Sequence, residues 1–425
     1  MRRVFRSLRN RNYRIWAAGA LVSNVGTWMQ RIAQDWLVLT ELTQHNATAV
    51  GTVMALQYGP HILLLPWTGS TADRLDRRRL LIVTQALQGL LALTLGVLTV
   101  TGLVALWHVY IFAFLLGCTN AFDAPARHTF VVDLVGEADL SNAVALNSTS
   151  FNAARMIGPA VAGLLIAAVG TGWAFILNAL SFVAMIGGLS ALHRGELQPR
   201  ARAAGHANAL FTQGLRYVWG RPDLLTQMLM VFLIGTFGLN FALFISTMSV
   251  SVFHGDSAQY GVLMSVMAIG SVSGSLLVAG QERPRMGHLL ISAAAFGVGC
   301  AVAATMPDPR WFAAALVPVG LSAMAFTNSS ASLVQLASAA DMRGRVTAIR
   351  LAILMGGTPI GAPLVGWTAD HWGPRWAMGI GAAAGTAAAL VAVMYLVRHQ
   401  GLHLERTSGR WRLRLEHQEY PSDPA

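Results

Sequence analysis

The sequence predicts an all-α membrane protein in which twelve transmembrane helices form two six-helix bundles. Of the 425 residues, 54% are hydrophobic and only 12% are charged, about half the charged fraction of an average soluble domain. Twelve apolar runs each approach the length of about 20 residues that a helix needs to cross a bilayer. Arg residues are concentrated in alternate connections between these runs. This composition excludes soluble multidomain enzymes, disordered chains and fibrous proteins.

The apolar runs fall into two groups of six. We place the spans at residues 15–39, 48–68, 80–101, 106–126, 142–169, 173–192, 224–247, 259–280, 287–305, 311–336, 346–369 and 375–397. The longest connection, 193–223, is polar and contains an amphipathic stretch at 209–219 that we expect to lie along the membrane surface. The expected domains are an N-terminal bundle (1–192), a cytoplasmic linker (193–223), a C-terminal bundle (224–400) and a cytoplasmic tail (401–425).

Arginine placement predicts the orientation of the chain. The formal charge of +11 comes from 30 basic residues, and none of them is Lys. Arg residues fill the N-terminal arm, the linker, the tail and the loops on one side, whereas the opposite loops hold only Arg310 and Arg375. By the positive-inside rule both termini are cytoplasmic, and we expect the plasma (inner) membrane as the location. A long apolar run follows the basic N-terminus, which predicts a retained first helix and not a signal peptide.

The residue types present argue against an enzyme. Without Lys the chain has no Walker A phosphate loop and no Lys for a pyridoxal or retinal Schiff base. Cys118 and Cys300 lie in separate apolar runs and are expected to be free, buried thiols. His-Glu-x-x-His, Gly-x-Ser-x-Gly and acidic metal clusters are missing from the sequence. We therefore expect no catalytic residues, no metal, no cofactor and no nucleic-acid partner.

The two groups of spans resemble each other in sequence. Residues 157–174 align without gaps on residues 360–377, with matched Gly158/Gly361 and Gly163/Gly366 among the pairs. These stretches fall in the fifth and eleventh spans, where a duplication of six helices would put them. Such parallel repeats are typical of secondary transporters, whose substrate site lies between the halves.

The loop after the second span carries an acid at the helix end followed by several cations. Its residues include Gly69, Asp73, Arg74, Asp76, Arg77 and Arg78. Positive-inside anchoring alone could explain the Arg run. The whole spacing, however, resembles the signature loop of the major facilitator superfamily, with Asp76 in place of the usual second glycine. That resemblance implies a latch that joins the cytoplasmic ends of the two halves.

Three downstream segments resemble the exporter branch of this superfamily, which includes enterobactin exporters and macrolide-efflux-like (transmembrane secretion effector) proteins. The segments are residues 121–127, 142–147 and 155–163. The resemblance implies the major facilitator fold and export of a small amphipathic compound by alternating access. The last segment is similar to the antiporter-type motif, in which Gly158 and Gly163 allow close helix approach and Pro159 permits a bend. A hinge and plain helix packing both remain open for it.

Four ionisable residues lie at apparent membrane depth, where charges are costly and mark function: Arg31, Asp35, Asp123 and Arg155. Arg31 and Asp35 are one helical turn apart, on one polar stripe with Asn24, Thr27 and Gln34 that must face protein or water. We predict Arg31, Asp35 and Arg155 as gate or proton-coupling residues. Asp35, near the outer edge, can carry a proton only if alternation breaks its contact with Arg31.

The remaining polar residues in the spans suggest packing or cargo contacts. Asp123 and Arg127 are expected to form a structural ion pair at the latch. Asn120, Asn240 and Asn328 are further cavity candidates, with interhelical hydrogen bonding as the alternative. Arg31 and Arg155 leave the cavity without surplus acid, which favours neutral or anionic amphipathic cargo such as a macrolide or a catecholate siderophore.

The expected partners are the small-molecule substrate, protons and membrane lipids, and we expect the protein to function as a monomer. The proton gradient is the expected energy source for export. An importer or lipid-facilitating transporter of the same fold is the first alternative. A membrane-embedded sensor or enzyme ranks below it.

Overall fold

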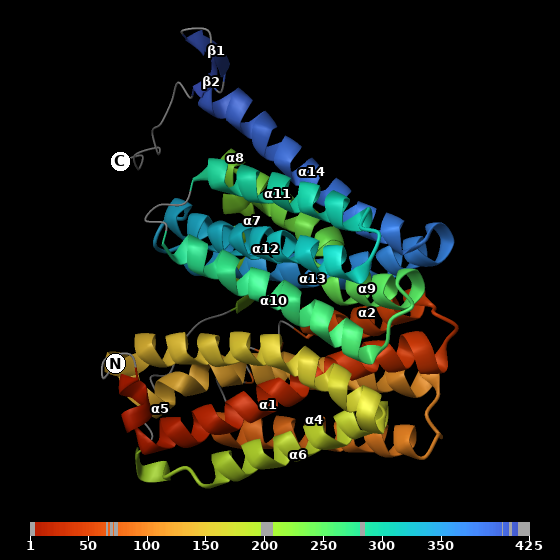
Figure 1. Cartoon of the computed structure of the whole chain (residues 1–425). Helices are drawn as coiled ribbons and strands as arrows, with labels where there is room; N and C mark the ends of the chain where they lie inside the picture. Colours follow the sequence, from red (N-terminus) through yellow and green to blue (C-terminus); the bar gives the residue numbers. More distant parts are fainter. Residues whose placement is uncertain are drawn as a thin grey trace.

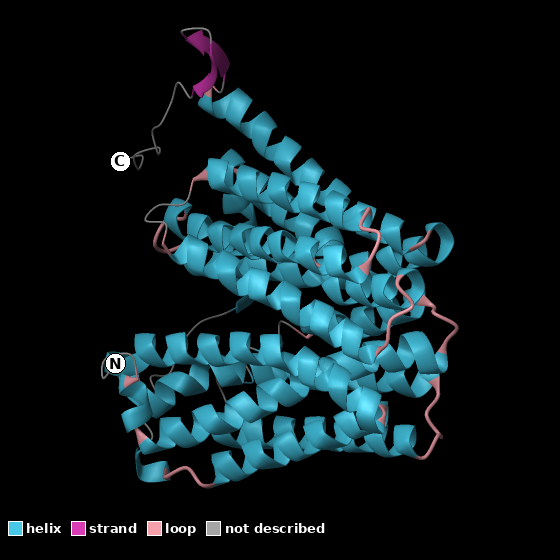
Figure 2. Ribbon diagram, viewed as in Figure 1, coloured by secondary structure: helices cyan, strands magenta, loops and turns pink. Residues whose placement is uncertain are grey.

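The computed structural model describes residues 5–64, 67–68, 71, 75–196, 207–280, 285–401, 403–407 and 410–414, and most of them are helical (Figures 1 and 2). The helices are α1 (Arg11–Trp36), α2 (Ala47–Leu63), α4 (Arg77–Val100), α5 (Leu106–Val169), α6 (Thr171–Ser190), α7 (Ala207–Trp219), α8 (Pro222–Leu233), α9 (Phe241–Thr247), α10 (Ser257–Ala279), α11 (Met286–Ala304), α12 (Pro309–Ala337), α13 (Arg343–Trp372) and α14 (Pro374–Gln400). Short 3-10 turns lie at Arg6–Arg9 and Arg194–Glu196, and π-helical turns at Leu37–Leu42, Ile234–Gly238 and Met248–Val252.

Helix α5 consists of two arms joined at Gly136. This glycine has φ 70° and ψ 178°, a backbone conformation that favours a residue without a Cβ. The arms, Leu106–Glu137 and Asp139–Val169, correspond to the fourth and fifth predicted spans. Both are longer than predicted because the helical hydrogen bonding continues beyond the apolar part of each run into polar sequence.

Ten helical segments in the described part of the chain are long and apolar enough to cross a membrane, so this is a multi-pass membrane protein. They are Arg77–Val100, the two arms of α5, Thr171–Ser190, Pro222–Val252, Ser257–Ala279, Met286–Ala304, Pro309–Ala337, Arg343–Trp372 and Pro374–His399. The first two predicted spans are not among them. Helix α1 carries the polar stripe, and α2 has only 17 residues. The count of twelve therefore stays a prediction that depends on α1 and α2.

The described part of the tail is not helical. Strands β1 (His403–Thr407) and β2 (Arg410–Arg414) form an antiparallel hairpin in which Leu404 lies opposite Leu413. In β2, Trp411 and Leu413 alternate with arginines, which is the period of a strand. The hairpin lies in the tail, and the predicted all-helical class is confirmed for the two bundles.

The helices form two bundles, one built from α1 to α6 and the other from α8 to α14 (Figure 1). Helix α7, predicted as an amphipathic surface segment, packs on the second bundle. The Arg345 Nη1 donates to Gln213 Oε1 over 3.1 Å, and the backbone N–H of Ala339 donates to the Tyr217 hydroxyl over 3.2 Å.

The bundles contact each other at the end away from the N-terminus, which we call the closed end (Figure 1). There the second arm of α5 packs on α10, and the Ser257 hydroxyl donates to the Gly163 carbonyl over 3.1 Å. A Cβ at Gly163 would lie only 2.5 Å from the Ser257 carbonyl oxygen, so glycine permits this approach. Helix α2 packs equally closely on α13, because a Cβ at Gly51 would lie 2.3 Å from the Ala362 carbonyl oxygen.

An acidic side chain adds a second contact at the closed end. The Asp370 carboxylate, at the end of α13, accepts hydrogen bonds from the backbone N–H groups of Ala47 (2.7 Å) and Thr48 (2.8 Å) at the start of α2. A carboxylate at a helix N-terminus satisfies unpaired N–H groups and is favoured by the helix dipole. The C-terminal bundle thus caps a helix of the N-terminal bundle.

Candidate functional site

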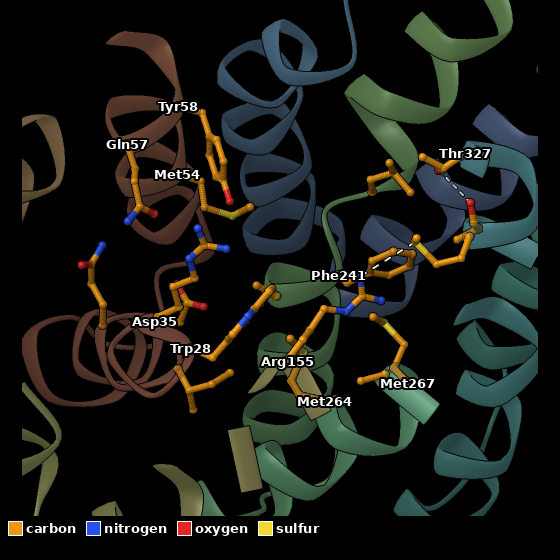
Figure 3. A pocket seen from close by; sticks show the side chains of 18 residues that line it. Trp28, Asp35, Met54, Gln57, Tyr58, Arg155, Phe241, Met264, Met267 and Thr327 are labelled. Atoms are coloured by element: carbon orange, nitrogen blue, oxygen red, sulfur yellow. Dashed lines mark hydrogen bonds between the residues drawn. The ribbon is translucent and has the colours of Figure 1, made fainter. Parts of the chain in front are cut away.

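A cavity of about 250 Å³ lies between the two bundles, near the closed end (Figure 3). Both bundles line it. The N-terminal bundle contributes Trp28, Arg31, Ile32, Gln34, Asp35, Met54, Gln57, Tyr58 and Arg155, and the C-terminal bundle contributes Leu239, Phe241, Ala242, Met264, Met267, Ala268, Ala323, Met324 and Thr327. A site shared by two repeats is the arrangement that alternating exposure requires.

Most of the cavity wall is apolar and adaptable. Four methionines, Met54, Met264, Met267 and Met324, line it together with aromatic rings such as Phe241. Thioether side chains are flexible and polarisable, so they fit apolar groups of differing shape. The wall can therefore hold a hydrophobic body without demanding one outline.

Two arginines bring charge into this apolar space. The Arg31 guanidinium lies 4.8 Å from the centre of the Trp28 ring, and its buried Nε has no hydrogen-bond partner in the structure. The Arg155 side chain reaches toward the C-terminal bundle, where Nη1 lies 3.8 Å from the Met324 sulfur (Figure 3). Among the described residues, neither arginine forms an ion pair.

Asp35 belongs to the closed end and not to a pair with Arg31. Its side chain is only 6% exposed and accepts a hydrogen bond from the Tyr260 hydroxyl over 3.1 Å. Tyr260 lies on α10, so this bond joins the two bundles. The expected contact between Arg31 and Asp35 is not among the ion pairs of the described residues, because Arg31 turns toward Trp28 and Tyr260 takes the carboxylate.

The seventh predicted span is discontinuous where it meets the cavity. After α8 and a π-helical turn, Leu239 and Asn240 leave the helix, and α9 starts at Phe241. The Asn240 Nδ2 donates to the Thr236 carbonyl over 2.8 Å, while its buried Oδ1 has no partner in the structure. Broken helices beside a central cavity are common in transporters, because the backbone there can line a site or move.

The predicted cavity residues are only partly brought together. Gln34 lines the cavity, Asn240 lies behind its wall, and Asn24, Thr27, Asn120 and Asn328 are half-buried away from it. Asn24 is ten residues before Gln34, about 15 Å along a helix, so one polar stripe reaches well beyond one cavity. Thr27 satisfies its hydroxyl within α1 by donating to the Ser23 carbonyl over 2.8 Å.

The described latch residues hold the N-terminal bundle together. The Asp76 carboxylate caps α4 by accepting from the Arg79 N–H over 3.0 Å. Arg77 forms an ion pair with Asp133 over 2.8 Å, and Arg78 Nε donates to the Leu189 carbonyl over 2.6 Å. Gly69, Asp73 and Arg74 lie outside the described residues.

Asp123 and Arg127 form an ion pair at 3.0 Å, and the pair belongs to a buried network. The Thr84 hydroxyl and the Gln85 amide each donate to the Asp123 carboxylate, over 2.7 and 2.8 Å. The Arg127 guanidinium lies 5.8 Å from the centre of the Trp16 ring. These contacts join α4 to the first arm of α5 within one bundle.

The fifth-span motif is regular helix in this conformation. Within α5, Gly136 is the residue with non-helical backbone angles, so Gly158, Pro159 and Gly163 form no break. A Cβ at Gly158 would lie 2.6 Å from the Trp28 Cβ, which identifies a close contact between α5 and α1. A hinge at this motif stays a prediction.

Besides most of the residues that line the cavity, Tyr260, Asp370 and Arg350 were not predicted from the sequence. Arg350 is 3% exposed, with Nε donating to the Ser330 hydroxyl (3.0 Å) and Nη2 to the carbonyl of the cavity residue Thr327 (2.5 Å). Its position inside the run 346–369 was an available signal, since a charge at membrane depth marks function. No signal in the sequence identified Tyr260, because its role depends on a partner in the other bundle.

In the described part of the chain, no three His, Cys, Asp or Glu side chains gather as metal ligands would. Cys118 and Cys300 are both free thiols as predicted, but only Cys300 is buried, and Cys118 is half-buried. The cavity therefore offers two guanidiniums, one carboxylate, the uncharged polar side chains of Gln34, Gln57, Tyr58 and Thr327, and an apolar wall.

Sequence comparisons connect this architecture to known proteins. Residues 3–417 match the family model described as transmembrane secretion effector. The staphyloferrin A transporter of Staphylococcus aureus is 28% identical over 257 residues, which cover 60% of this chain and 63% of that transporter, less than two thirds of its length. The multidrug efflux pump Tap of Mycolicibacterium fortuitum is 27% identical over 83% of this chain and 88% of its own. Macrolide efflux protein A of Streptococcus pyogenes is 24% identical, and the alignment covers 85% of this chain and 91% of that protein.

Solved structures share the fold at low sequence identity. The nucleoside transporter NupG superposes with a TM-score of 0.71 at 11% identity, covering 90% of this chain and 98% of that one. A bacterial homologue of the human lysosomal transporter Spinster, in an inward-facing and occupied conformation, superposes with a TM-score of 0.69 at 13% identity. The superposition covers 91% of this chain and 96% of that one. With the family match spanning nearly the whole chain, the protein belongs to the transmembrane secretion effector family of major facilitator transporters.

Proposed function

We propose that the chain is a secondary active transporter that exports a small amphipathic compound across the plasma membrane by alternating access, driven by protons. The observation that carries the proposal is a cavity lined by both bundles and closed at one end by contacts that cross between them. Such contacts can open only if the bundles move relative to each other. The efflux pumps among the relatives support export, and the staphyloferrin A transporter supports a small-molecule cargo.

The proposed orientation places the closed end outside the cell. The start of α1, the linker helix α7 and the end of α14 all lie toward the opposite end, where the Arg-rich segments are (Figure 1). With both termini cytoplasmic, the conformation described here would admit cargo from the cytoplasm. Because a single chain supplies both sides of the cavity, we propose that a monomer suffices and that no cofactor is needed.

Proton coupling is assigned to Asp35. In this conformation the carboxylate is buried and held by Tyr260 of the other bundle. Opening the closed end would separate the two residues and expose Asp35 to outside water, so its protonation would follow the conformation. One proton crossing 100 mV releases about 2.3 kcal/mol, enough for a gradient of roughly fifty-fold in a neutral cargo.

The latch and the fifth-span motif complete the proposed cycle. When the cytoplasmic end closes, the loop that includes Asp73 and Arg74 would contact the C-terminal bundle, while Arg77 and Arg78 keep it anchored on α5 and α6. Gly158 and Gly163 would let α5 slide or bend against α1 and α10 during the change.

The test uses inside-out vesicles energised by respiration, with a macrolide and a catecholate siderophore as trial cargoes. If the protein exports its cargo, the cargo should accumulate inside these vesicles, and an uncoupler should abolish the accumulation. Asp35→Asn should remove uphill accumulation but leave downhill flux, because the carboxamide cannot carry a proton. Asp308→Asn, which alters a helix cap away from the cavity, is the matched control.

Each alternative gives a different result. Accumulation in right-side-out vesicles would identify an importer, and movement of lipid without uptake of either cargo would identify a lipid-facilitating transporter. Full uphill accumulation by Asp35→Asn would show that Asp35 is not the proton carrier.

A further inference from the structure

The charge of the cavity is unbalanced. Of the eighteen residues that line it, Arg31 and Arg155 are cationic and Asp35 is the one acid. Asp35 already accepts a hydrogen bond from Tyr260, which belongs to the closed end. The two guanidiniums thus face the cavity with no carboxylate bonded to either of them among the described residues.

Both guanidiniums also have unused hydrogen-bonding capacity. Each carries five N–H donors, and a buried donor without an acceptor is destabilising. The Arg31 Nε is buried and has no hydrogen-bond partner among the residues that the structure describes. Among the described residues, Arg155 donates to the Met324 sulfur at 3.8 Å, and a thioether is a weak acceptor. An incoming oxyanion would satisfy donors that the protein itself leaves open.

We propose that the cavity binds an amphipathic anion, with a carboxylate-type oxyanion at Arg31 and Arg155 and the apolar body among the four methionines and Phe241. This inference rests on the proposed function, since it names the cargo class of the same cavity. Arginine favours such anions because its planar fork matches two oxygens at once. The methionine wall accounts for tolerance toward the shape of the body.

A cationic cargo does not fit this arrangement. It would meet two guanidiniums, and the Trp28 face that could hold a cation is already covered by Arg31 at 4.8 Å. The cavity volume of about 250 Å³ lies just below the range of about 300–1,000 Å³ typical of drug-sized sites. It therefore encloses a charged group and a fused ring pair, and a larger cargo would extend toward the open end.

The experiment compares three probes with the same ring system: 1-naphthoate, 1-naphthylmethylammonium and 1-naphthalenemethanol. Binding to the full chain in nanodiscs is measured by calorimetry. We expect naphthoate to bind at least tenfold more tightly than either of the other probes. Arg31→Gln and Arg155→Gln should each weaken naphthoate at least tenfold and change the alcohol less than twofold, whereas Arg155→Lys should recover part of the loss. Arg310→Gln, an exposed arginine outside the cavity, is the control.

Equal affinity for the three probes, preference for the ammonium, or no naphthoate binding at millimolar concentration would overturn the inference. So would unchanged naphthoate affinity in both Gln variants. A chloride titration of the wild type gives a measurement that does not depend on variant folding, because chloride should compete with naphthoate and not with the alcohol. If efflux of a macrolide is abolished by an uncoupler but the three naphthyl probes bind equally well, the anion site is refuted and the proposed function stands. Naphthoate selectivity without energised accumulation would refute the proposed function alone.

Discussion

A single added methyl group at the closed end should raise the ratio of conformations that are open at this end to those that are closed. In Gly163→Ala, the new Cβ would lie 2.5 Å from the Ser257 carbonyl oxygen, whereas real Cβ atoms keep at least 3.0 Å. The two backbones must therefore separate by roughly half an ångström or more. Overpacking of this kind costs about 1–3 kcal/mol, and only the conformation in which the two bundles meet at the closed end bears the cost. At 1.4 kcal/mol per tenfold, the ratio of open to closed should rise about 5- to 150-fold.

The assay measures the distance between two loops at the closed end, one from each bundle. Spin labels at Thr101→Cys and Thr305→Cys, in a background without Cys118 and Cys300, report the separation of the bundles at the closed end. We expect the long-distance population to increase in Gly163→Ala.

The matched control is Gly187→Ala, because a Cβ there meets nothing within 4 Å. Both substitutions remove a helical glycine and so share the propensity gain of about 1 kcal/mol, which leaves the contact with Ser257 as the difference. If the two variants give the same distance distribution, the packing between α5 and α10 does not control the closed end, and the reasoning is refuted.

Other contacts of the structure give further predictions. Asp370→Ala should weaken the cap on α2 by about 1 kcal/mol and raise the open population about fivefold in the same spin-label pair, whereas Asp308→Ala, which removes a cap within one bundle, should not change that population. Tyr260→Phe removes the hydrogen bond to the buried Asp35 carboxylate and should raise the ratio of open to closed conformations tenfold or more. An unchanged distribution of spin-label distances would contradict a bridging role for Asp35. Arg77→Gln should lower the free energy of unfolding by about 1.5–3 kcal/mol, because it removes the ion pair with Asp133. The control is Arg79→Gln, which changes an exposed side chain and should leave the unfolding midpoint nearly unchanged.

The sequence predicted the site unevenly. Arg31, Asp35 and Arg155 were identifiable because an ionisable side chain inside an apolar run is costly, and all three line the cavity. Their partners were not identifiable: Asp35 pairs with Tyr260, which is 225 positions away and sits in an ordinary apolar run. Helical periodicity shows which face of α1 is polar, but it does not show what lies opposite that face.

The amino-acid sequence by itself determined the membrane-embedded helical class and the family. Hydrophobic run length, arginine distribution and local motifs are properties of the chain read in order, so they need no knowledge of neighbours in space. Only the tertiary structure decided which end is closed, that Asp370 caps α2 and that two arginines in one cavity form no ion pair with any described carboxylate. Those features depend on how the two bundles meet, and contacts between segments hundreds of residues apart are set by packing of the whole fold.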